Sequence, residues 1–286
     1  MKKIILIILF TSSYGAGFAQ TPPFRVRLYH ETEPVYFTLE QTSADIEGYD
    51  GDEIIVEAVP SPPESIPAAA AGLKQIAVPG NTKEDLNIRP RMQDDNAAMR
   101  ISIPPGNYRH LLIKVPRTAL VFVHILNNYV DGNIKATNVN SIQIEGIVQF
   151  VDVSNVTNFV IEVGENWRGM RGNGKVTVSN IRWTDAPVIV NDASKHRTCI
   201  IQTNNSDVVL SVADDSKTNI VFSSMYSQTY TNLNTDAINS PESDVREFKR
   251  ILGGTPLRLQ TLKLGGGGVN TIIGSTYGNV FIKKQE

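Results

Sequence analysis

The chain has 286 residues, a formal net charge of −2 at pH 7 and a single cysteine, Cys199. The mild acidity argues against nucleic acid as a partner, and one cysteine excludes an internal disulfide framework. The length allows one large domain, or two, with a substantial apolar core.

Residues 1–19 have the pattern of a cleaved signal peptide. Met1-Lys2-Lys3 supplies positive charge, Ile4 to Phe10 is apolar, and small residues lead to Ala19. The apolar run is too short to cross a bilayer of about 30 Å, although a buried first strand is the alternative interpretation. We expect an exported protein of the periplasm or cell surface, with no integral membrane segment after cleavage behind Ala19.

Residues 20–107 are expected to form N-terminal β-strands and a capping loop. Apolar and polar residues alternate over 24–28 and 35–39, and another strand is expected over 54–59, after a turn. This pattern predicts meandering β-structure with one solvated face. The prolines between Pro60 and Pro67 begin a loop, and residues 73–97 have no clear period.

Residues 134–163 contain the most informative pattern, because short apolar strands recur there every eight or nine residues between small polar turns. Such strands bury enough apolar surface only if each stacks on its neighbours around a shared core. Asparagine recurs at the turns, where its tolerance of left-handed backbone suits tight corners. We therefore predict an all-β fold, an elongated parallel β-solenoid over residues 108–286, with 20–286 forming one continuous domain.

One short helix is predicted in the C-terminal region. Ser240 is its expected cap, Pro241 its first residue and Gly253 its stop, with Val245, Phe248 and Leu252 on one face. That face is expected to cover an open edge or end of the stacked strands. Strands follow over 257–264, 269–273 and 279–282, and the four glycines 265–268 are predicted to form a turn, since no lysine or helix follows them as in a phosphate loop.

The candidate ligand-binding residues are Trp167, Arg168 and Arg171, in a glycine-rich surface loop. An indole can pack on a sugar face and arginine can bind an acid, although an ordinary packed tryptophan is the plainer interpretation.

Cys199 is expected to be a buried apolar residue. No histidine has a partner at metal-ligand spacing, so the sequence predicts no metal, no cofactor and no catalytic residues. The nearby carboxylate pairs are Asp185 with Asp192 and Asp214 with Asp215, and the second pair fits a solvated turn.

Several segments, in this order, resemble the DUF4097 family of putative adhesins. These are Ile46–Ala58, the Ile113-Lys114-Val115-Pro116 step, the repeat Asp131–Val139 and the ending Gly265–Lys284. The leader end Ala19-Gln20 is similar to those of exported Bacteroidota proteins. The resemblance covers the chain from about residue 24 onward, with a departure at 167–174. It implies a right-handed parallel β-solenoid-like fold, an exported or surface-associated protein, and adhesion; it implies no catalytic residues.

Three functions follow as hypotheses. The first is a non-catalytic binding or adhesion module of the bacterial envelope, with a protein or glycan ligand on an elongated face and no nucleic-acid partner. The second is an envelope-stress or signalling accessory protein that contacts a membrane partner. The third is a solenoid-type polysaccharide lyase or hydrolase, which would need convergent carboxylates near Arg168 or Arg171.

Overall fold

The computed structural model describes residues 23–28, 34–40, 42–60, 89–93, 98–103, 108–126, 132–164, 174–179, 181, 199–213, 215–252, 258–267 and 269–285. The predicted leader, most of the loop 60–97 and the helix stop at Gly253 lie outside these ranges.

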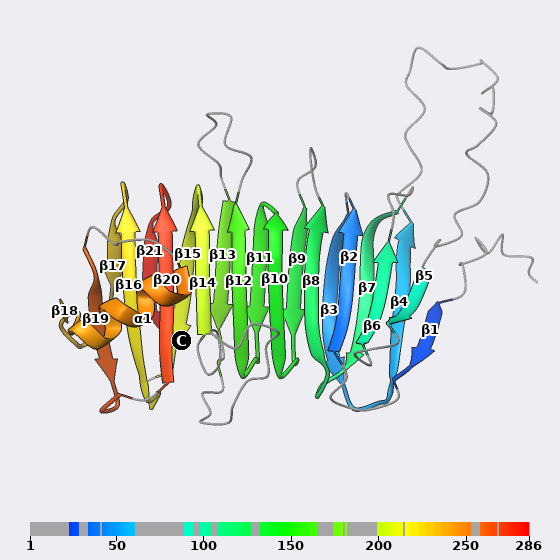
Figure 1. Ribbon diagram of the computed structural model, residues 1–286, viewed down its shortest axis with the longest axis horizontal. Helices are drawn as coiled ribbons and strands as arrows, with labels where there is room; N and C mark the ends of the chain where they lie inside the picture. Colours follow the sequence, from blue (N-terminus) through cyan, green and yellow to red (C-terminus); the bar gives the residue numbers. More distant parts are fainter. Residues whose placement is uncertain are drawn as a thin grey trace, which may run out of the picture.

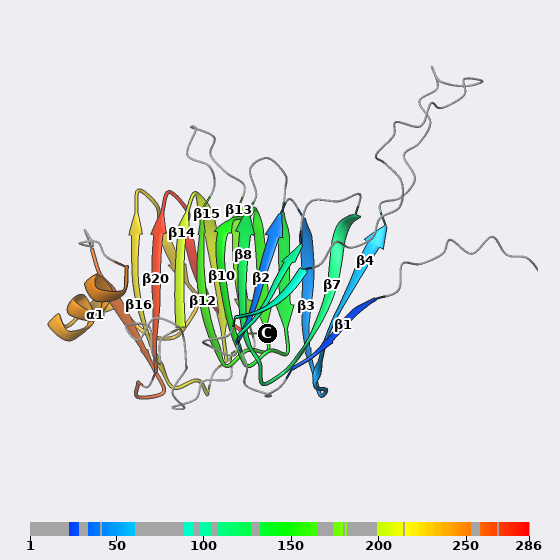
Figure 2. The ribbon, with the colours of Figure 1, turned by 45° about the vertical axis from the view of Figure 1, so that its right-hand side comes forward.

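Two long, mostly parallel sheets face each other across one core (Figures 1 and 2). Within the described ranges, sheet A has ten strands in the spatial order β1 (Phe24–Arg27), β4 (Glu53–Pro60), β7 (Tyr108–Pro116), β3 (Ser43–Tyr49), β9 (Asn133–Thr137), β11 (Phe150–Ser154), β13 (Gly174–Ser179), β15 (Ser206–Val212), β21 (Val280–Lys284) and β17 (Thr229–Thr231). Sheet B has eleven, in the order β18 (Ile238–Asn239), β19 (Gln260–Leu264), β16 (Thr218–Met225), β20 (Val269–Thr276), β14 (Cys199–Asn204), β12 (Asn158–Gly164), β10 (Ser141–Ile147), β8 (Leu120–Leu126), β2 (Pro34–Glu40), β6 (Ala98–Ile103) and β5 (Arg89–Gln93). The predicted all-β parallel solenoid is confirmed.

The repeat over 134–163 is the regular part of this solenoid. Successive strands alternate between the sheets, so a full rung takes 17 residues, and side chains 17 residues apart hydrogen-bond, as Ser154 Oγ does to Thr137 Oγ1 at 3.3 Å. The inward positions Ile142, Ile144, Val151 and Val153 are all at most 3% exposed. Side chains alternate along a strand, so one parity fills the core and the other faces outward.

Asparagines hold several corners, as the sequence predicts. Asn138, Asn155 and Asn205 have positive φ values of 61°, 53° and 62°. Asn155 Nδ2 also donates to Asn138 Oδ1 at 3.2 Å, which joins the corners of adjacent rungs. The predicted glycine turn is confirmed too, because Gly265, Gly266 and Gly267 have positive φ between β19 and β20.

The predicted meander over 24–59 is wrong for β2 and β3. These strands lie in opposite sheets and run parallel to their neighbours: β2 lies between β6 and β8, and β3 lies between β7 and β9. The first parallel rung along the chain is therefore inserted between two rungs formed later, visible as blue between green and teal in Figure 1. Alternation fixed the inward residues Val35, Phe37 and Leu39 correctly, but pairing depends on distant strands.

The C-terminal rung is inserted in the same way. β20 lies between β14 and β16, and β21 lies between β15 and β17, although both come last in the chain. Figure 1 shows this red rung between yellow ones. The rungs nearest both ends of the chain are thus hydrogen-bonded on both sides, and the antiparallel strands β1, β4, β5, β18 and β19 lie beyond them toward the ends of the stack.

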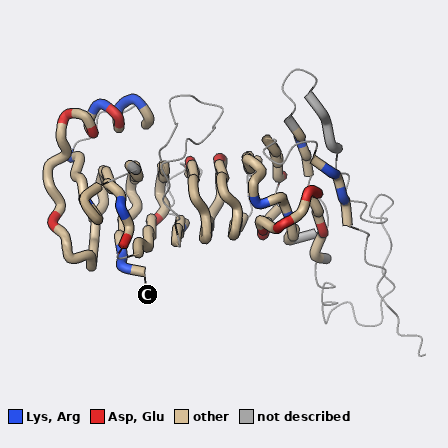
Figure 3. The backbone as a smooth tube through the Cα atoms, turned by 90° about the horizontal axis from the view of Figure 1, so that it is seen from below, with Lys and Arg blue, Asp and Glu red and all other residues tan. Residues whose placement is uncertain are grey.

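Helix α1 (Glu242–Leu252) lies on the outer face of sheet B (Figures 2 and 3), which corrects the expected position over an edge or end. Phe248, Ile251 and Leu252 pack on outward apolar residues of four strands, Val160, Ile200, Val221 and Ile272. Thr261 Oγ1 donates to Asp244 Oδ2 at 2.9 Å and anchors the first turn. Phe248 and Leu252 of the predicted stripe lie in this contact, whereas Ile251 takes part in place of the half-buried Val245. The helix covers this face because four strands place apolar groups there.

The buried side chain of Ile144 should contribute much more to the free energy of unfolding than the outward side chain of Gln143. It is fully buried, whereas Gln143 beside it points outward. Replacing Ile144 by Ala leaves a cavity, so we expect the free energy of unfolding in urea to fall by about 3 kcal/mol. Gln143→Ala should change it by no more than about 0.5 kcal/mol. Equal effects of the two substitutions would contradict the assigned inward and outward faces.

Cys199 should give the protein a specific sensitivity to alkali. Burial raises the pKa of its thiol from 9.0 to about 12, partly offset by a hydrogen bond with the backbone of Phe159. Above pH 9 the unfolded chain releases this proton while the folded protein retains it, so folding loses stability as the pH rises. From about pH 8 to about pH 10 we expect the free energy of unfolding to fall by about 1 kcal/mol more than in Cys199→Ala. Parallel pH profiles of the two proteins would show that the thiol is not buried.

Candidate functional site

The predicted ligand residues Trp167, Arg168 and Arg171 lie outside the described residues, between β12 and β13. Of the predicted carboxylate pairs, Asp185, Asp192 and Asp214 also lie outside them, and Asp215 is exposed. The described part of the chain gathers a different set of side chains, on the outer face of sheet B.

The register of four parallel strands builds this site. Tyr36 of β2 is the Cα partner of Arg100 on β6 and of Phe122 on β8, and Phe122 is the partner of Gln143 on β10. Two residues further along, Thr38, His124 and Glu145 form a second row. All of these positions have outward parity, because the residues between them, such as Phe37 and Val123, fill the core.

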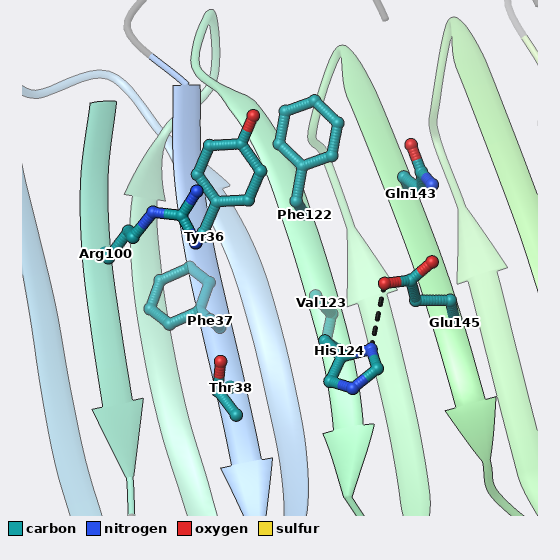
Figure 4. Close-up of a pocket in the computed structure, with 9 residues that line it drawn as sticks. All are labelled: Tyr36, Phe37, Thr38, Arg100, Phe122, Val123, His124, Gln143 and Glu145. Atoms are coloured by element: carbon teal, nitrogen blue, oxygen red, sulfur yellow. Dashed lines mark hydrogen bonds and ion pairs between the residues drawn. The ribbon is translucent and has the colours of Figure 1, made fainter. Parts of the chain in front are cut away.

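The first row is an aromatic stack with a cation at one end. The rings of Tyr36 and Phe122 lie 4.5 Å apart at an interplanar angle of 13°, and the Arg100 guanidinium carbon lies 4.9 Å from the Tyr36 ring centroid (Figure 4). The stack leaves only 8% of Phe122 exposed. Such stacking fixes the side-chain rotamers, so the polar groups beside the rings are held in place.

The second row contains an oriented histidine. His124 Nδ1 lies 2.8 Å from Glu145 Oε1, which holds the imidazole plane and leaves Nε2 for another partner. Both side chains are nearly half exposed, at 46% and 45%. Thr38 is the neighbour of His124 on the other side, and within the described residues no hydroxyl or thiol hydrogen-bonds to this histidine.

A depression of about 390 Å³ lies over these two rows (Figure 4). Its lining combines the Tyr36–Phe122 stack with guanidinium, imidazole, carboxylate, amide and hydroxyl groups from Arg100, His124, Glu145, Gln143 and Thr38. This volume is within the range of small-ligand sites, and the mix of ring surface with donors and acceptors suits a polar ligand.

The described residues form no cluster suited to binding a metal ion. Among them, no three His, Cys, Asp or Glu side chains gather closely enough to hold a metal ion. Within the same ranges, no helix has the length and apolar character needed to cross a membrane.

Comparison of the sequence with protein-family models and with curated proteins finds no match in either case. Comparison with solved structures finds a putative cell adhesion protein from Clostridium sporogenes, at 12% identity and a TM-score of 0.37, over 92% of this chain and 99% of that one. The resemblance to the DUF4097 family therefore stays a prediction.

Sequence reasoning missed all the residues of the depression. The available signal was parity: in the apolar run 120–126, Phe122 and His124 are outward, and Tyr36 and Thr38 have the same parity in 34–40. Parity does not predict the spatial order β6-β2-β8-β10, and that order brings these residues together from separate parts of the chain.

Proposed function

We propose that this protein is an exported, non-catalytic binding module of the bacterial envelope, of the adhesion type, and that the sheet B depression holds its ligand. The observation that carries the proposal is the convergence of Arg100, His124 and Glu145 beside a fixed aromatic stack, in a hollow of ligand size. Export is supported by the leader pattern of residues 1–19.

The chemistry of the depression favours a glycan over a protein ligand. A sugar offers hydroxyl groups in many directions, and the lining supplies donors from Arg100 and Gln143 together with acceptors from Glu145 and Thr38. The Tyr36–Phe122 stack adds apolar surface for the carbon faces of a ring. A hollow of about 390 Å³ suits one or two sugar units at the end or branch of a chain.

The groups that line the depression suit ligand binding better than catalysis. Glycoside hydrolysis by the usual mechanism needs two carboxylates on opposite sides of the scissile bond. Among the residues that line the depression, Glu145 is the carboxylate, and it is hydrogen-bonded to His124. An activated nucleophile would have to hydrogen-bond to His124, and no described hydroxyl or thiol does.

Binding of the purified protein to a glycan array, with affinities of the retained glycans measured by calorimetry, tests the proposal. Arg100→Ala and Glu145→Gln each remove a charged group from the depression, so we expect each to weaken binding by about tenfold or more. Lys175→Ala and Asp152→Asn on the outer face of sheet A are the matched controls and should bind as the parent protein does.

Three results would contradict the proposal. Retention of no glycan, together with capture of a protein, would place the ligand in another class. Equal loss in the site variants and the sheet A controls would show that the depression is not the binding site. Turnover of a bound polysaccharide would overturn the non-catalytic assignment.

A further inference from the structure

The most exposed large apolar side chains gather at the C-terminal end of the solenoid. Tyr226 is 71% exposed, Tyr277 61%, Tyr230 51% and Ile238 46%, the four highest values among such side chains in the described residues. Tyr226 stacks on Tyr277 with ring centroids 5.0 Å apart, and Tyr230 stacks on Phe281 at 5.3 Å. Exposed aromatic groups in one place are typical of an interaction surface.

Corner geometry does not explain why tyrosine occupies two corners at this end. Tyr226 and Tyr277 have positive φ values of 60° and 64°, the conformation that asparagine adopts at other corners of this protein. A bulky residue is strained there by about 1 kcal/mol or more, and such strain concentrates at functional positions. The chain therefore keeps ring surface at this end despite its cost in stability.

An open strand edge lies in the same place. β17 is the last strand of sheet A in the described part of the chain, with β21 on its inner side. Gln228 O accepts from Val280 N, so the backbone groups of Gln228 face β21. Backbone groups alternate between the two edges of a strand, so those of Thr229 and Thr231 point away from the solenoid.

The edge strand itself carries no charged residue, and the Lys283 ammonium lies on its inner neighbour, 5.9 Å from the Phe281 ring centroid. The stretch 226–240 contains one charged residue, Asp236. At the opposite edge of the sheet, β1 carries Arg25 paired with Glu53 and Arg27 paired with Asp52. Charge on an edge strand prevents pairing with another molecule, and its near absence at β17 leaves pairing possible.

We propose that a second copy of this chain docks here, through antiparallel pairing of β17 with β17 of the other copy about a twofold axis at Tyr230. The strand sequence Thr229-Tyr230-Thr231 reads the same in both directions, as an isologous pair requires. Thr229 of one copy then exchanges backbone hydrogen bonds with Thr231 of the other. The two Tyr230 residues form the close, non-hydrogen-bonded pair, and the Phe281–Tyr230 stack continues into the partner.

A second copy fits better than an unrelated peptide because this surface is self-complementary about a twofold axis. In an isologous contact, groups at the twofold axis meet their own copies, so a charged residue at the axis would repel its copy and the uncharged Tyr230 does not. The dimer would place its two sheet B depressions far apart, which suits two-point attachment to a repetitive ligand.

Analytical ultracentrifugation of the purified protein tests the dimer directly. We expect a concentration-dependent dimer. Tyr230→Lys should raise its dissociation constant by about tenfold or more, because two lysines would face each other at the axis. Thr231→Lys is a second variant with the same expected direction. Phe150→Lys, on the outer face of the same sheet and 39% exposed, should dimerise as the parent protein does.

A monomer at all concentrations up to about 100 µM would overturn the proposal, as would dimers that persist unchanged in Tyr230→Lys and Thr231→Lys. Circular dichroism of each variant checks that the solenoid is folded. Glycan affinity is measured separately, so failure of the dimer leaves the sheet B assignment to its own test.

Discussion

Each rung of this protein can bury its apolar side chains only between its two neighbouring rungs and the opposite sheet. A strand such as β11, with five residues, contributes only Val151 and Val153 to the core. The hydrophobic gain from two valines does not offset the conformational entropy of ordering five residues unless the rest of the stack is present. The shared core is therefore the interaction on which the sheets, the corners and both surfaces depend.

Insertion of the terminal rungs strengthens this dependence. A simple solenoid ends in rungs that are covered on one side, and those can open without disturbing the others. Here β2 and β3, near one end of the chain, and β20 and β21, near the other, are hydrogen-bonded on both sides by rungs from elsewhere in the sequence. Opening either one would expose the inner residues of two neighbours, so the stack should unfold as a unit.

The same parity that fills the core also prepares the outer face of sheet B. One outward row runs in register from Arg100 through Tyr36, Phe122 and Gln143 to Val160, and continues to Ile200, Ile272 and Val221. Its second half is apolar and is covered by α1. Its first half combines a cation, stacked rings and an amide, and the depression lies there. A change of residue type along one row thus divides the face between structure and binding.

Local features of the fold could be predicted from the sequence, and long-range ones could not. The spacing of Ile142, Ile144, Val151 and Val153 gives their inward direction, because alternation is a property of the strand itself. The presence of the helix likewise follows from local charge and an apolar stripe, although it begins at Glu242 rather than at Pro241 and the predicted cap Ser240 bonds Thr261 instead. The positions of β2 and α1 depend on which distant strands lie beside them. The residues around Val35 in the sequence do not indicate that Met99 and Val121 are its partners.

The candidate site was missed for the same reason. Tyr36, Arg100 and Phe122 come from three separate segments, and their contact exists only after β2 is inserted between β6 and β8. The parity of each residue was available, whereas their adjacency was not.

Hydrogen exchange of the native protein tests the inserted rungs most directly. The amides of β2, β3, β20 and β21 should exchange as slowly as those of the central strands β10 and β12, because all of them open only when the stack unfolds. The edge strands β1 and β18 should exchange earlier. Early exchange of β2 and β3, or of β20 and β21, together with these edges would show that the terminal rungs lie at the ends of the stack, and would contradict the account.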